Sequence, residues 1–95
     1  MEVRLNQDTL ESMAWKDYHA LEDRMRAWTL AAEAELQSGE APRKIVFDLL
    51  FWANGEFHRR RRYMEREEPE TERRAGEILR ALAVKMQEAK KEREL

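Results

Sequence analysis

The chain has 95 residues, of which 42% are hydrophobic and 40% are charged, with three Gly, two Pro and no Cys. Its formal net charge is −2, so no overall field directs it toward nucleic acid or an anionic membrane. The absence of Cys excludes disulfides and cysteine-based catalytic or metal sites, and it is compatible with a cytoplasmic location. No apolar run approaches the ~20 residues of a membrane span, so we expect no membrane association. This composition is typical of long helices, and the length fits a single helical domain over residues 1–95.

The first predicted helix covers about residues 8–38. Asn6 or Asp8 suits its N-cap, and Glu11 three positions after Asp8 resembles a helix-capping box. Gly39 suits the position just after the helix. Apolar residues recur every three or four positions, which indicates a helix with one buried stripe. This stripe consists of Leu10, Ala14, Tyr18, Leu21, Met25, Trp28, Ala32 and Leu36.

The second predicted helix covers about residues 43–67 and is apolar on nearly every side in its first half. Asn54-Gly55 either ends this helix or lies inside it, and we expect a continuous helix because the apolar spacing stays in phase across it. The main stripe consists of Val46, Leu50, Ala53, Phe57, position 60 and Met64. Two further stripes consist of Ile45, Leu49 and Trp52, and of Phe47 and Phe51. This surplus of apolar side chains predicts an oligomer, since one helical hairpin covers only some of them.

Pro69 separates the second helix from the third, which is predicted over about residues 70–93. The apolar residues of the third helix follow the alternating spacing of four and three that is typical of a heptad seam. They are Ala75, Leu79, Leu82, Met86 and Ala89, and Ile78 supplements this seam. Together the three elements predict an all-α fold, either a three-helix bundle or a helical hairpin with long helices that oligomerises.

Four consecutive arginines, Arg59, Arg60, Arg61 and Arg62, follow the apolar half of the second helix. Consecutive helical residues point about 100° apart, so the four cannot all face one nucleic-acid duplex. The residues that follow are rich in Glu, which favours a solvated or paired face over a phosphate-binding patch or a contact with an acidic protein. Because the main stripe passes through position 60, we expect Arg60 to be the most buried of the four and the least tolerant of replacement.

No constellation of residues points to catalysis or to a metal site. His19 and Glu22, three apart on one helix, could ligate a metal only if other helices supplied carboxylates. The Glu-x-x-His motif of carboxylate-bridged metal bundles is absent from the sequence, as is a Gly-rich phosphate loop. We therefore expect a protein that is not an enzyme, with no cofactor and no metal.

The sequence favours a small helical protein–protein interaction module, such as an adaptor, inhibitor or assembly factor. Its expected contact residues are the apolar anchors and the orienting charges of the second helix. They are Ile45, Phe47, Phe51, Trp52, Phe57, Arg59, Arg60, Arg61 and Arg62. The alternative is a small dimeric nucleic-acid-binding regulator that uses the four arginines together with Arg43 and Lys44. A protein partner and a homo-oligomer are expected, whereas nucleic acid is disfavoured.

Overall fold

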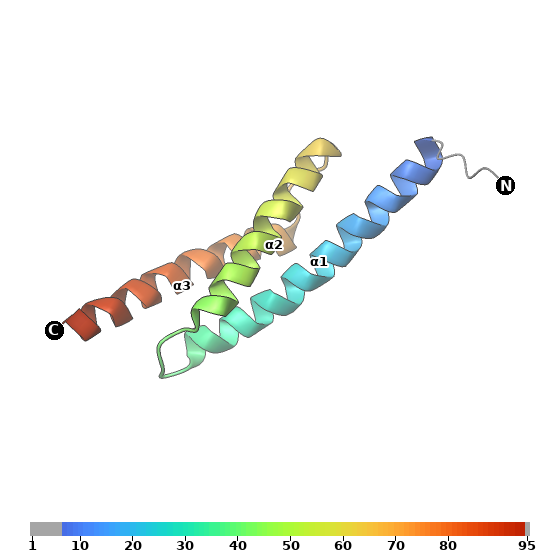
Figure 1. Ribbon diagram of the computed structural model, residues 1–95. Helices are drawn as coiled ribbons and strands as arrows, with labels where there is room; N and C mark the ends of the chain where they lie inside the picture. The colour runs from blue at the N-terminus through green and yellow to red at the C-terminus, as the bar shows by residue number, and fades with distance from the viewer. Residues whose placement is uncertain (1–6, 95) are drawn as a thin grey trace.

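The computed structural model describes the backbone of residues 7–94 and the side chains of residues 17–93. Three helices make up this part of the chain, α1 (Gln7–Gln37), α2 (Lys44–Tyr63) and α3 (Glu70–Glu94), and it contains no strand. Each helix packs against both others, which confirms the predicted all-α fold and, of the two predicted architectures, selects the three-helix bundle (Figure 1). Some predicted positions lie outside the described side chains, namely Asn6, Asp8, Leu10, Glu11 and Ala14.

α1 and α2 form an antiparallel hairpin, and α3 returns beside them in the direction of α1 (Figure 1). Two ion pairs join the helices of the hairpin, between Arg60 and Asp17 at its open end and between Arg43 and Glu35 beside the turn. The start of α1 and the end of α3 lie at opposite ends of the molecule, which measures 65 × 28 × 19 Å. The bundle is therefore elongated.

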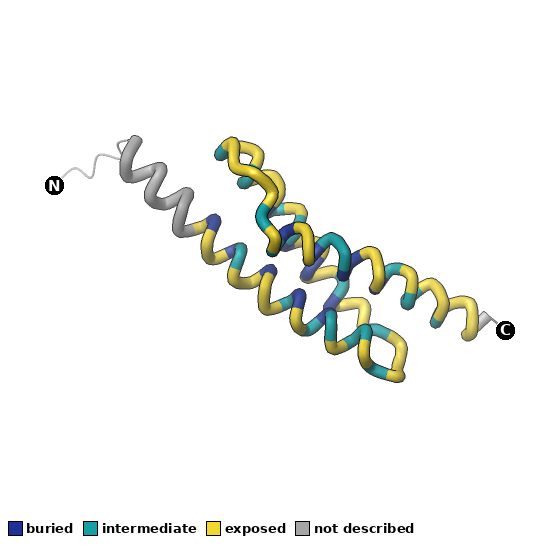
Figure 2. Tube along the Cα trace, turned by 180° about the vertical axis from the view of Figure 1, so that it is seen from behind, coloured by how far each residue is buried: buried dark blue, intermediate teal, exposed yellow. Residues whose placement is uncertain are grey.

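The core is formed by the stripes that the apolar spacing predicts. Met25, Leu50, Phe57 and Leu82 are completely buried, and the buried positions follow the inner sides of the helices (Figure 2). Thr29 is buried with them and donates its hydroxyl to the Met25 carbonyl at 2.7 Å, which satisfies this polar group inside the helix. The buried apolar residues are Tyr18, Leu21, Met25 and Ala32 of α1, Val46, Leu50, Ala53 and Phe57 of α2, and Ala75, Ile78, Leu79 and Leu82 of α3.

The C-terminus of α1 is capped by a side chain from another helix. Lys85 of α3 donates its ammonium group to the carbonyl oxygens of Glu35 at 2.7 Å, Leu36 at 3.3 Å and Ser38 at 2.6 Å. α1 has no basic residue in its own last turn, so this ammonium group supplies the positive charge that a helix C-terminus favours. Gly39, which we expected to cap the helix, does not have a positive φ, and Lys85 bonds the terminal carbonyls instead.

α2 is continuous across Asn54-Gly55, as the phase of the apolar spacing predicts. Gly55 is exposed, and a Cβ added there would meet no atom within 4 Å. Ala53 and Phe57 on either side of it are completely buried. Tertiary packing therefore compensates for the weak helix propensity of this glycine.

α2 ends before residue 67, where we expected it to end, because the backbone reverses at Glu65. Glu65 has a φ of 54°, the left-handed conformation that commonly terminates helices. Its amide donates to the Arg62 carbonyl at 3.1 Å, and the amide of Arg66 donates to the Arg61 carbonyl at 2.9 Å. These two bonds form a Schellman motif, which turns the chain toward α3.

Candidate interaction surface on the second helix

The exposed apolar side chains of α2 lie in two groups, on either side of its buried stripe. The first group, which we name the α1-side ridge, consists of Ile45, Leu49 and Trp52, with exposed fractions of 58%, 36% and 49%. The Trp52 ring lies 6.3 Å from that of Trp28, so the α1-side ridge adjoins α1. Burial of apolar surface is favourable by about 25 cal/mol per Å², so a ridge of this kind favours a partner.

The second group, which we name the Phe pair, consists of Phe47 and Phe51. Their rings stack with centroids 5.8 Å apart, and Phe51 is 64% exposed whereas Phe47 packs partly against the core. In a helix of about 3.6 residues per turn, Phe47 points in nearly the same direction as Arg61, which contacts α3. The Phe pair and the α1-side ridge therefore lie on opposite flanks of the buried stripe of α2.

Phe57, the remaining apolar residue that we expected to contact a partner, lies elsewhere. Its side chain is completely buried, and its ring lies 4.6 Å from that of Tyr18 of α1. Phe57 is thus a core residue, which corrects the expectation, because the main stripe of α2 turns it toward the other helices. Burial, reinforced by the nearby Glu22 carboxylate, raises the pKa of the Tyr18 phenol.

The four arginines point in different directions, as expected for consecutive helical residues. The expectation that Arg60 is the most buried is wrong, because 44% of its side chain is exposed, against 11% for Arg61. The step of four from Phe57 to Arg61 and the step of three to Arg60 rotate the side chain to opposite sides of the buried stripe, by about 40° and about 60°. Arg61 meets α3, where Glu72 pairs with it, while Arg60 faces α1 and reaches Asp17 at 3.5 Å.

Arg61 is the centre of a polar cluster that joins α2 to α3. Its guanidinium donates to both carboxylate oxygens of Glu72, from Nε at 2.8 Å and from Nη2 at 2.9 Å. Nη1 donates to the Arg66 carbonyl at 3.0 Å, and Nη2 lies 2.9 Å from Nδ1 of His58. The hydrogen bonds with Glu72 raise the pKa of Arg61. The cluster holds the corner between the two helices, so Arg61 is not available to a partner.

The remaining basic side chains near α2 are mostly paired within the chain. Arg59 pairs with Glu56, one turn earlier on the same helix. Arg62 is exposed, and its side chain makes no ion pair among the described residues. Arg43 and Lys44, which the nucleic-acid alternative also requires, each pair with a carboxylate. These pairs leave only a small net field at this surface.

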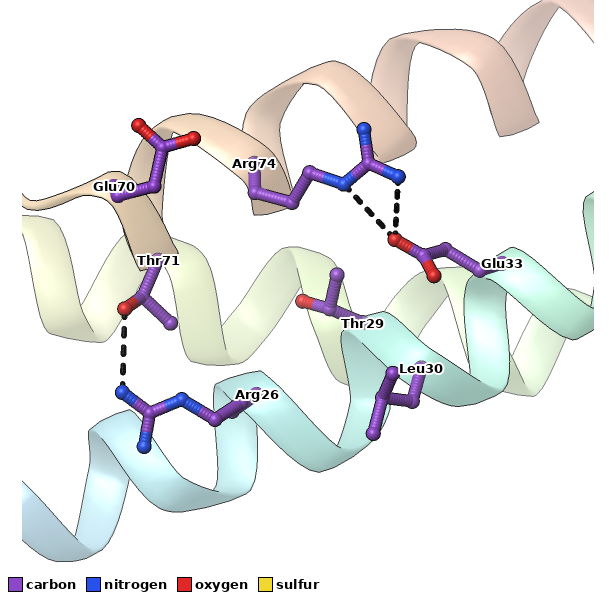
Figure 3. Close-up of a pocket in the computed structure, with 7 residues that line it drawn as sticks. All are labelled: Arg26, Thr29, Leu30, Glu33, Glu70, Thr71 and Arg74. Atoms are coloured by element: carbon purple, nitrogen blue, oxygen red, sulfur yellow. Dashed lines mark hydrogen bonds and ion pairs between the residues drawn. The ribbon is translucent and has the colours of Figure 1, made fainter.

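A hollow of about 260 Å³ opens between α1 and the start of α3 (Figure 3). Arg26 donates to the Thr71 hydroxyl at 3.5 Å on one side of the hollow, and Arg74 pairs with Glu33 at 2.7 Å on the other. The two arginines are matched by Glu33 and Glu70, so the hollow has no net charge that would hold an anion. We assign it no ligand.

Within the described side chains, no three His, Cys, Asp or Glu residues lie together in a way that could hold a metal ion. None of the described helices is both long and apolar enough to cross a membrane. Comparisons with protein-family models, with curated proteins and with solved structures found no match. The function is therefore inferred from the α1-side ridge and the Phe pair.

Proposed function

We propose that this chain is a small protein–protein interaction module that binds its partners through the exposed apolar side chains of α2. The observation that carries this proposal is the exposure of Ile45, Phe51 and Trp52 on a helix whose core positions are already filled. Large aromatic and aliphatic side chains are common anchors of protein interfaces. Monomeric proteins rarely leave several of them together in solvent, so their exposure favours a binding role.

Charged side chains border the apolar groups, which fits the polar rim of a protein interface. Arg59 and Arg62 are exposed beyond the apolar half of α2, where they would orient a partner with acidic groups. Nucleic-acid binding has less support, because Arg60 and Arg61 are engaged with carboxylates of α1 and α3. Protein binding therefore accounts for more of the surface.

A comparison of Phe51→Glu with Leu30→Glu tests the proposal, since both wild-type side chains are 64% exposed and only Phe51 lies on α2. Glu is a good helix former, so both variants should fold. Each chain is immobilised as bait in an extract of its native host and the bound proteins are quantified by mass spectrometry. We expect a protein that wild type and Leu30→Glu retain and that Phe51→Glu loses.

Two results would contradict an interaction role for α2. One is a set of bound proteins that is the same for all three baits. The other is salt-sensitive binding of generic duplex DNA or RNA by the purified chain, which would favour the nucleic-acid alternative.

A further inference from the structure

The α1-side ridge borders a strip of small side chains on α1. This strip, which we name the alanine seam, consists of Ala20, Ala27, Ala31 and Ala34. Steps of seven, four and three residues place its members on one side of the helix. Ala31 is half-buried and the other three are exposed. Ala20 lines the same hollow as Trp52, so the seam and the ridge share one outward face of the α1–α2 hairpin.

Contacts within the hairpin give the height of each residue along this face. The two tryptophan rings that join the helices lie 6.3 Å apart, so Ala27 is level with Trp52. The ion pair of Arg43 with Glu35 joins the helices beside the turn, so Ala34 is level with Ile45. Ala31 and Leu49 lie between these two levels. A small residue of α1 therefore stands beside each large residue of α2.

We propose that this outward face binds a second copy of this chain, with the alanine seam of each copy packed against the α1-side ridge of the other. A two-fold axis parallel to the helices produces this arrangement, because it places α1 on α2 of the other copy and keeps every residue at its own height. Large side chains then meet small ones along both contacts, as close packing requires. This dimer rests on the proposed function, since it names a partner for one of the two apolar flanks.

A two-fold axis across the helices fits the same face less well. It would place α1 on α1 and α2 on α2, so that the alanine seam faces another seam and the ridge faces another ridge. Gaps between small side chains and crowding between large ones both lower stability. The match of sizes therefore selects the axis parallel to the helices.

Charge along the face favours the same arrangement. Arg24 is in phase with the alanine seam, and its side chain makes no ion pair among the described residues. Glu56 is in phase with the ridge and also pairs with Arg59 of its own helix. Arg24 and Glu56 line the hollow that also contains Trp52, so they lie near one another along the face. The parallel axis brings Arg24 of each copy toward Glu56 of the other, which gives two opposite-charge contacts per dimer.

The face is of a size suited to a weak contact. The alanine seam extends over residues 20–34 of α1, about 20 Å, and two helices packed about 9 Å apart present a strip about 20 Å wide. The footprint is about 400 Å² per copy, or about 800 Å² in total, the size of a transient interface. We therefore expect association at tens to hundreds of micromolar.

Analytical ultracentrifugation of the full chain from about 1 to about 300 µM tests for the dimer, since this range brackets micromolar affinities. We expect wild type to convert from monomer to dimer as its concentration rises. Ile45→Glu should raise the dissociation constant at least about tenfold, because each dimer would bury the new carboxylate twice. Val84→Glu is the matched control, since Val84 of α3 is also 58% exposed but lies outside the face, and it should dimerise like wild type.

Introduced cysteines test the arrangement, because the chain has no cysteine of its own. The variants Ala31→Cys and Leu49→Cys are mixed and treated with a short bismaleimide. We expect a covalent dimer that joins the two different variants, recognised by its mass, and little product from either variant alone. Products that join two copies of one variant would overturn this arrangement, and a wild type that stays monomeric to about 300 µM would overturn the dimer.

Failure of the dimer can be told apart from failure of the proposed function. A monomeric wild type leaves the capture experiment with Phe51→Glu intact, because the Phe pair lies on the other flank of α2. A dimer that forms as described, without any Phe51-dependent partner, would support self-association and remove the Phe pair from the proposed binding surface.

Discussion

Arg61 of α2 and Glu72 of α3 form a doubly hydrogen-bonded ion pair in the corner between the two helices, with only 11% and 5% of their side chains exposed. Two parallel bonds fix the direction of both side chains as well as their distance. His58 borders the pair, with Nδ1 3.4 Å from a Glu72 oxygen and 2.9 Å from Nη2 of Arg61. A buried pair of this kind holds the corner only while both partners are present.

Removing one partner of this pair should destabilise the chain strongly. Glu72→Gln and Arg61→Ala each leave a buried charged group without its partner, a change that costs about 3–5 kcal/mol. Arg62→Ala is the control, because it removes an exposed arginine and should change stability by about 0.5 kcal/mol or less. Urea unfolding followed by circular dichroism measures all three variants. Equal midpoints for Arg61→Ala and Arg62→Ala would show that the pair contributes little.

The double variant Arg61→Met/Glu72→Leu separates charge pairing from packing. It leaves no charge unpaired in the corner, so it should be more stable than either single variant and close to wild type. This comparison remains informative if the single variants fail to fold. A double variant that is no more stable than the singles would assign their loss to packing instead.

Glu65→Gly should stabilise the chain. Glu65 is the only non-glycine residue of the described backbone with a positive φ, and an L-residue in this region costs about 1–2 kcal/mol. Glycine avoids this strain but adds entropy to the unfolded chain, so the expected gain in the free energy of unfolding is about 0.5–1 kcal/mol. Glu67→Gly is the control, because Glu67 has no positive φ and its replacement should be neutral or destabilising. Thermal melts that rank the two variants in the opposite order would contradict the left-handed turn.

Lys85→Met should loosen the end of α1. The change keeps an unbranched apolar side chain but removes the ammonium group that bonds the carbonyl oxygens of Glu35, Leu36 and Ser38. A cation at a partly buried helix C-terminus contributes up to about 2 kcal/mol, so we expect a loss of about 1–2 kcal/mol. Hydrogen exchange should quicken in the last turn of α1, and it should not do so in Lys90→Met, which changes an exposed lysine of the same helix. Hydrogen exchange in the last turn of α1 that is equally fast in Lys85→Met and Lys90→Met would rule out the cap.

The turn between α1 and α2 should weaken in acid. Arg43 donates to the Glu35 carboxylate from its side chain and, at 3.3 Å, from its backbone amide, and these bonds lower the pKa of Glu35 below its ordinary value. The folded chain thus favours the charged carboxylate. The resulting stabilisation is complete above the ordinary carboxyl pKa and is lost as the pH falls through that value and then through the lower folded one.

Carbon-detected NMR titration checks this assignment for Glu35. Its pKa should rise toward the ordinary value in Arg43→Gln. The pKa should stay low in Lys44→Gln, because Lys44 pairs with Asp48 instead. A Glu35 titration that is unchanged by Arg43→Gln would refute the role of this arginine.

The helices and most of the core could be predicted from the sequence, because apolar spacing reports directly which side of a helix is buried. Val46, Leu50 and Ala53 are all buried at predicted positions. The same spacing could not choose between Arg60 and Arg61, since steps of three and four both continue a stripe with a period of about 3.6 residues. Arg61 is the more buried of the two because α3 places the Glu72 carboxylate against it.

Contacts between helices could not be predicted in this way. Glu72 belongs to an acidic first turn that the helix dipole explains, but its pairing depends on the reversal at Glu65. The role of Lys85 depends on α3 passing the end of α1. Leu49 was expected only as part of an apolar stripe, and whether such a stripe is core or surface depends on which flanks the other helices cover.

The two connections of the bundle also bear on the order in which it folds. One ion pair closes each connection. Arg43 and Glu35 are 8 residues apart, and Arg61 and Glu72 are 11 residues apart. Contacts between α1 and α3 span far more of the chain, 41 residues for Arg74 with Glu33. Loop-closure entropy rises with this separation, and helical proteins rich in local contacts fold in microseconds to milliseconds. We therefore expect each helix to pair first with its neighbour in sequence, and the α1–α3 contacts to form last.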